Sequence, residues 1–81
     1  MMDAKALETL LSQNLHNAEV TVHSEDGTHF EALIVSPEFE GQSLLARQKS
    51  VYAALGDLIS SGKVHALALK TRTPAEMSAT Q

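Results

Sequence analysis

Two short segments rich in β-branched and aromatic residues, with an Asp-Gly pair between them, constrain the fold of this chain most strongly. They span residues 19–23 and 29–35, and Asp26-Gly27 lies in the connection 24–28. An Asp-Gly pair between two such segments is a strong signal for a β-hairpin. The sequence therefore predicts two antiparallel strands joined by a tight turn.

The register of this hairpin decides which side chains share a face of the sheet. A strict two-residue loop at Asp26-Gly27 would place Val22 opposite Glu31 and mix apolar with charged side chains. One additional bulged residue is favoured, because it places His23 and His29 together on the outer face and the apolar side chains on the inner one. The inner side chains in this register are Val20, Val22, Phe30, Ala32 and Ile34.

Apolar residues at helical spacing predict one helix on each side of the hairpin. Asp3 can cap a first helix over about residues 4–15, and a longer helix over about residues 44–60 ends before Gly62. The apolar stripe expected on the longer helix contains Leu44, Leu45, Val51, Tyr52, Leu55, Leu58 and Ile59. The residues expected on its opposite, solvated face are Arg47, Lys49 and Asp57.

The rest of the chain predicts a third strand and a short last helix. Residues 64–70 alternate around Val-Ala-Leu, and Pro74 suits the first position of a helical turn. A strand–helix–strand connection is right-handed and makes the third strand parallel to the second. We therefore expect one α/β (α+β) domain over residues 1–81, in the order α-β-β-α-β with a three-stranded mixed sheet, and a disordered tail over about 77–81.

This topology gathers histidines at one end of the sheet. His29 begins the second strand and His65 begins the third, and parallel neighbours begin at the same end. The hairpin turn brings His23 to that end as well. Three of the four histidines are therefore expected to lie close together.

Composition excludes several classes of function. With no cysteine, the chain of 81 residues can form no disulfide, thiolate zinc site or all-cysteine iron–sulfur centre. A net charge of -4 opposes tight binding to duplex nucleic acid.

The longest apolar run, residues 32–35, is too short to span a bilayer and no signal peptide is evident, so a cytoplasmic protein is expected. No nucleophile elbow or catalytic carboxylate pair stands out, and we expect no enzyme.

Four motifs occur in an order and spacing that resemble the BolA family. The likeness extends over nearly the whole chain, and the short Asp-Gly hairpin is similar to that of the IbaG-like branch. It implies a BolA-like, class II KH-like α-β-β-α-β fold with a short C-terminal helix. The motifs are Phe39-Glu40-Gly41, Leu44-Leu45-Ala46-Arg47-Gln48-Lys49-Ser50-Val51-Tyr52, Val64-His65-Ala66-Leu67-Ala68-Leu69-Lys70-Thr71 and Thr73-Pro74-Ala75-Glu76.

The resemblance also implies a function. Members partner monothiol glutaredoxins, with glutathione, as heterodimers that share a 2Fe-2S cluster, and they act in iron–sulfur trafficking and in iron or stress responses. By position, His65 would be a cluster ligand, and the hairpin would supply the second ligand. Since the hairpin lacks cysteine, His23 and His29 are both candidates. Alone, the chain is expected to be a monomer without a cluster.

Some members are described as transcriptional regulators, which leaves DNA binding through the basic helix 44–60 as an alternative. Arg47, Lys49 and Lys70 are its candidate contacts with nucleic acid or with a partner protein. The sequence departs from the family pattern in two places, since Gln48 replaces a common histidine and Met77 a common tryptophan. The loop acids, which we expect to be solvated, are Glu25, Asp26, Glu38 and Glu40.

Overall fold

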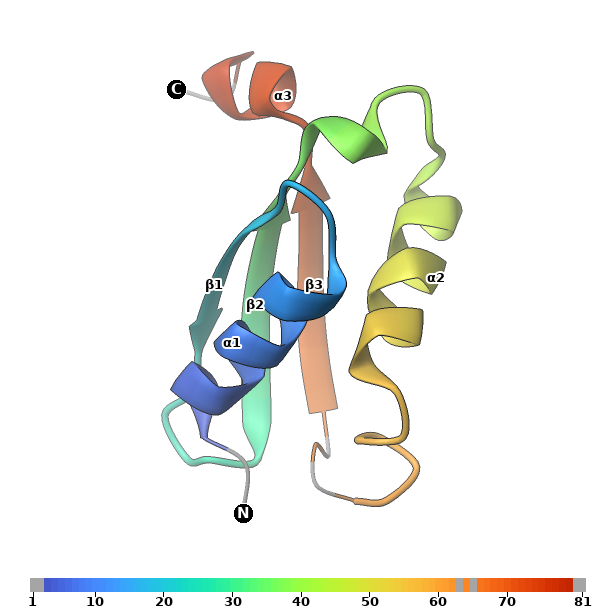
Figure 1. Cartoon of the computed structure of the whole chain (residues 1–81). Coiled ribbons are helices and arrows are strands. Elements are labelled where there is room, and N and C mark those ends of the chain that lie inside the picture. The colour runs from blue at the N-terminus through green and yellow to red at the C-terminus, as the bar shows by residue number, and fades with distance from the viewer. Residues whose placement is uncertain (1–2, 63, 65, 80–81) are drawn as a thin grey trace.

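The computed structural model describes residues 3–62, 64 and 66–79 (Figure 1). The predicted order of elements is confirmed over these residues, and a short 3-10 helix follows the hairpin. None of the helices found there has the length and apolar character needed to cross a membrane. The elements are α1 (Ala4–Asn14), β1 (Glu19–His23), β2 (His29–Val35), η1 (Pro37–Phe39), α2 (Leu44–Leu55), β3 (Ala66–Arg72) and α3 (Pro74–Ala79).

The three strands form one mixed sheet in the order β1-β2-β3. β1 is antiparallel to β2, and β2 is parallel to β3, as the right-handed crossover requires. Val22 pairs with Ala32 and Val20 with Ile34, which confirms the register favoured from the sequence. The loop between the strands takes up the additional residue, and Ser24 closes it by donating from Oγ to the carbonyl oxygen of His29 at 2.7 Å.

Helices α1 and α2 cover one face of the sheet, and the core lies between the two layers (Figure 1). Alternate side chains of each strand point into this core, while those between them face away from it. The opposite face of the sheet is thereby left without a helix over most of its length. The core side chains are Leu7, Leu11, Phe30, Ile34, Phe39, Val51, Ala54, Leu55, Leu58 and Val64.

Helix α2 ends at Leu55, five residues before the predicted end at about residue 60. The cause is Gly56, whose φ of 64° and ψ of -125° lie outside the helical region. Turns continue to Gly62, and the chain packs Leu58 into the core. The apolar residues after Gly56 extended the apparent periodicity beyond the true end of the helix.

The predicted faces of α2 are also partly wrong. Arg47 occupies the buried stripe, with Val51 and Leu55 one and two turns further along the helix. The sequence pattern instead predicts Arg47 on the solvated face of the helix. Its burial is possible because its charge is neutralised by Glu76, as described below. The large apolar side chains that are exposed instead are Leu44, Leu45, Tyr52 and Ile59, at 59%, 61%, 44% and 41%.

The C-terminal part of the chain differs from the prediction at two boundaries. β3 covers Ala66–Arg72, two residues later than the predicted strand at 64–70. α3 begins at Pro74 as predicted and continues to Ala79, so residues 77–79 are helical rather than a disordered tail. Residues 80 and 81 lie outside the described part. Thr73 caps this helix, because its Oγ1 accepts a hydrogen bond from the backbone N–H of Glu76 at 3.1 Å.

Candidate functional site

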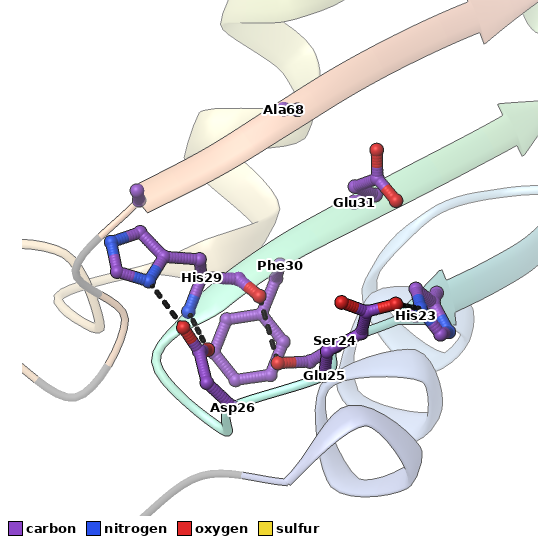
Figure 2. Close-up of a pocket in the computed structure, with 9 residues that line it drawn as sticks. His23, Ser24, Glu25, Asp26, His29, Phe30, Glu31 and Ala68 are labelled. Carbon is purple, nitrogen blue, oxygen red and sulfur yellow. Dashed lines mark hydrogen bonds and ion pairs between the residues drawn. The ribbon is translucent and has the colours of Figure 1, made fainter.

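His29 begins β2, and the hairpin loop fixes its position through Asp26 (Figure 2). Oδ1 of Asp26 accepts hydrogen bonds from the backbone N–H groups of Thr28 and His29 at 2.9 and 2.8 Å. Oδ2 of Asp26 lies 2.7 Å from Nδ1 of His29. The backbone hydrogen bonds from His29 and Thr28, followed by the contact with the imidazole, lower the pKa of Asp26 well below its usual range. Asp26 is therefore an ionised acceptor at neutral pH.

This contact determines which ring nitrogen of His29 is available. An ionised carboxylate only accepts hydrogen bonds, so the proton of the neutral imidazole lies on Nδ1. Nε2 then keeps its lone pair, and 69% of the side chain is exposed. A carboxylate that holds the second nitrogen of a histidine is a common arrangement behind metal-binding histidines, because it fixes the tautomer and orients the ring. Nε2 of His29 is thus available to donate its lone pair to a metal ion.

His23, the last residue of β1, is held less firmly. It pairs with Glu31 across the hairpin, and 63% of its side chain is exposed. Its Nε2 lies 3.8 Å from Oε1 of Glu25, a long contact between exposed groups that fixes the ring weakly. Figure 2 shows the two imidazoles at opposite ends of the labelled group of residues. The prediction that His23 and His29 share the outer face near the turn agrees with the register.

The strand order separates the two candidate hairpin ligands. β2 is the central strand, and His29 pairs directly with Ala66 of β3. His23 belongs to β1, one strand further from β3. His65, which precedes Ala66 in the sequence, lies outside the described residues, so its proximity to His29 stays a prediction. The parallel pairing of β2 and β3 from which that prediction followed is confirmed.

His23 and His29 border a hollow of about 480 Å³ at the hairpin end of the sheet (Figure 2). Ala66 and Ala68 lie on its β3 side and leave room beside the imidazole of His29. In the described part of the chain, no three side chains among His, Cys, Asp and Glu are arranged to hold a metal ion together. The residues lining the hollow are His23, Ser24, Glu25, Asp26, His29, Phe30, Glu31, Ala66 and Ala68.

The donors present suit a shared 2Fe-2S cluster only in part. An imidazole with a free Nε2 can replace a thiolate on one iron, as histidines do in Rieske-type centres. The chain contains no cysteine, so another molecule would have to provide every thiolate. The described residues at this hollow therefore offer imidazole nitrogen to such a cluster but no complete ligand set.

The cationic residues proposed to contact nucleic acid or a partner do not form one surface. The guanidinium of Arg47 is bound to Glu76, which raises the pKa of Arg47, and only 11% of the arginine side chain is exposed. Lys49 is exposed on α2, in the layer that covers one face of the sheet. Lys70 is exposed on β3, beside Leu33 on the opposite face.

Sequence reasoning missed the role of Asp26, which was expected to be a solvated loop acid. The available signal was the Asp-Gly turn itself, because an Asp side chain in a turn commonly accepts hydrogen bonds from the backbone two or three residues later. These are the two bonds from Thr28 and His29. Nothing in the sequence indicates that the second carboxylate oxygen of Asp26 faces the imidazole of His29.

Comparison with known proteins identifies the family of this chain. The family described as BolA-like protein matches residues 2–76. The chain belongs to the BolA family. This BolA-like chain is 36% identical over 75 residues to the acid stress protein IbaG of Escherichia coli (strain K12), covering 93% of the chain and 88% of that protein. It is 40% identical over 80 residues to BolA-like protein 1 of Bos taurus, covering 88% of the chain and 58% of that protein.

Solved structures agree with this assignment. The structure of a BolA protein homologue from Coxiella burnetii superposes with a TM-score of 0.86 at 39% identity, covering 96% of this chain and 99% of that one. BolA1 from Arabidopsis thaliana superposes with a TM-score of 0.75 at 33% identity, covering 94% and 96%. The BolA-like fold class predicted from the sequence is confirmed.

Proposed function

We propose that this BolA-like chain is a cytoplasmic, non-enzymatic adaptor that acts in iron–sulfur cluster trafficking and in the response to iron or stress. It binds a monothiol glutaredoxin, with glutathione, as a heterodimer and shares a 2Fe-2S cluster with it. Family membership and the relative named acid stress protein support the stress-related part. The lack of cysteine supports the division of ligands, in which this chain gives nitrogen and the partner gives sulfur.

The observation that carries the proposal is the 2.7 Å contact between Asp26 and Nδ1 of His29. It leaves Nε2 as an oriented, exposed donor on the strand next to β3. His23 has only a 3.8 Å contact with Glu25 and lies on the far strand. We therefore assign His29 as the hairpin ligand, with His65 as the ligand from the third strand.

In this arrangement the residues of the chain bind and orient, and they perform no bond-making step. A bound 2Fe-2S cluster would supply one-electron chemistry and would also be the cargo that the heterodimer passes on. Nitrogen ligation on one iron raises the reduction potential relative to an all-thiolate centre. Asp26 keeps the imidazole of His29 in the required tautomer, and the small side chains of Ala66 and Ala68 leave space for the partner.

The proposal can be tested by mixing the purified chain with glutaredoxin that carries its cluster and recording visible circular dichroism. We expect the wild-type chain to change the spectrum, and His29→Ala and His65→Ala to abolish the change. His23→Ala should preserve it, as should His16→Ala, which alters a histidine at the opposite end of the hairpin strands. An unchanged spectrum with the wild-type chain contradicts the function, whereas loss with His23→Ala but not with His29→Ala contradicts the ligand assignment.

DNA binding through α2 is the alternative proposal, and it has less support. Arg47 is engaged with Glu76, and Lys49 and Lys70 belong to opposite layers of the molecule. A titration with duplex DNA at increasing salt would reveal phosphate contacts as a steep fall of affinity with the logarithm of salt concentration. Absence of binding at low salt would remove this alternative.

A further inference from the structure

The face of the sheet opposite the helices carries two outward-facing positions on β1 and three each on β2 and β3 near the hairpin end. Successive residues of a strand alternate between the faces, so the pairing defines rows of side chains across this face. His29 and Ala66 form the first row. The second row is His23, Glu31 and Ala68. The third row is Thr21, Leu33 and Lys70.

Two hollows follow one another along these rows. The first, of about 480 Å³, is the one beside His29. The second, of about 220 Å³, lies further along the strands and is lined by Leu33 and Lys70 among others. Both hollows are lined by His23, Glu31 and Ala68, so they adjoin along the face, and we refer to the two together as the depression. Among the three residues that line both hollows, Ala68 has the smallest side chain.

Charge is distributed unequally along this depression. Glu31 lies at its centre, on the side of the acidic hairpin, and Lys70 lies one row beyond it. Neither side chain has an ion pair with another residue of the described part of the chain. Both are exposed. Among the described residues, this face therefore presents a carboxylate and an ammonium group without ion-pair partners, one row apart along the strands.

The depression is limited at its other end. Val35 of β2 borders a separate hollow together with Pro74 and Met77 of α3. Figure 1 shows α3 at that end of the sheet, away from the hairpin. The uncovered region is thus the hairpin half of the face, which contains His29 and the two hollows.

We propose that the thiolate-bearing partner docks across this face, with a cationic group against Glu31 and an anionic group against Lys70. The inference rests on the proposed function, because a partner that reaches Nε2 of His29 also lies over the neighbouring rows. Ala68 allows the partner's backbone or a small side chain to approach the sheet closely. Opposite charges in register with Glu31 and Lys70 fix the orientation and increase the association rate.

The experiment measures binding of apo monothiol glutaredoxin with glutathione by calorimetry. Ala68→Arg fills the depression and is expected to weaken binding at least tenfold, while Ala53→Arg, on the exposed side of α2, should leave it within twofold. Lys70→Glu should weaken binding several-fold, with the loss decreasing at high salt. The matched control, Lys5→Glu on α1, makes the same charge change in the other layer. Far-UV circular dichroism and urea midpoints establish that each variant is folded.

The outcomes separate this inference from the function on which it rests. If the wild-type chain does not bind, both are overturned. If the wild-type chain binds, but the dissociation constants of Ala68→Arg and Lys70→Glu stay within twofold of the wild-type value, the docking face is wrong while the adaptor function stands. If the chain alone self-associates and Lys70→Glu abolishes that association, the face belongs to a second copy and the proposed partner is overturned.

Discussion

Arg47 of α2 and Glu76 of α3 form a bidentate ion pair across 29 residues of sequence, with Nη1 to Oε1 at 2.7 Å and Nη2 to Oε2 at 3.1 Å. Nε of Arg47 also donates to the carbonyl oxygen of Gln42 at 3.1 Å. The pair therefore links the last helix, the start of α2 and the loop before it. A helix of six residues has little stability of its own, so α3 depends on this contact.

Replacing Glu76 with Gln should destabilise the protein. The variant leaves a largely buried guanidinium without its negative partner, and removal of one member of a charged hydrogen-bonded pair costs more than the pair contributes. We expect the thermal unfolding midpoint to fall by about 4–8 °C, the shift typical of a moderate loss in a domain of this size. Asp57→Asn, an exposed change without a described side-chain partner, should leave the midpoint unchanged.

The same pair predicts a pH dependence of stability. The hydrogen bonds from Arg47 and from the backbone of Thr73 lower the pKa of Glu76 to about 2 from an ordinary value of 4.5. A lowered folded-state pKa stabilises the protein fully above the unfolded value, and this stabilisation is lost as the pH falls from 4.5 towards 2. The difference in urea midpoint between wild type and Glu76→Gln should shrink over that interval. A difference that stayed constant down to pH 2 would show that the carboxylate charge is not responsible.

Asp26→Ala tests the orientation of His29. The substitution removes the acceptor for Nδ1 and for two backbone N–H groups of the hairpin. Loss of such a supporting contact typically weakens metal binding about 10–100-fold. We expect the apparent dissociation constant to rise by the same factor when cluster-loaded glutaredoxin is titrated into the variant. Glu25→Ala is the matched control, because Glu25 is the adjacent hairpin acid and its ion pair within the described residues is with His23. Equal effects of the two variants would contradict the assignment of His29.

The end of α2 gives a test of backbone geometry. Gly56 has φ of 64° and no atom within 4 Å of an added Cβ, so Gly56→Ala carries a conformational cost without a clash. We expect a loss of about 1–3 kcal/mol in the free energy of unfolding, the cost of holding an L-residue in a sparsely populated backbone region. A synthetic chain with D-alanine at this position should retain full stability, because the mirror-image residue favours positive φ. Equal stability of the two alanine forms would contradict the described end of α2.

The sheet was predictable because its determinants are local or topological. Alternation in β1 and β2 allowed only one register that separated Val22 from Glu31, and the crossover rule fixed the direction of β3. The faces and the end of α2 were not predictable in the same way. Apolar residues surround much of this helix and continue after Gly56, and the partner that allows Arg47 to be buried is distant in the sequence.

Only part of the arrangement around the hairpin histidines was predictable from the sequence. The shared face of His23 and His29 followed from the hairpin register. The choice between them depends on the strand order β1-β2-β3, which places β2 and not β1 beside β3. The sequence alone did not establish which strands are neighbours. The contact of Asp26 with the imidazole required the loop conformation, which is set by several hydrogen bonds at once.

The start of β3 is anchored by Val64, which is fully buried and whose N–H donates to the carbonyl oxygen of Leu58 at 3.1 Å. The turns over residues 57–62 precede this anchor and lie mostly at the surface. Surface turns accept additional residues at little thermodynamic cost. A reporter peptide spliced into this turn region would thus extend away from the molecule, and the alignment of β3 with β2 beside His29 would be preserved.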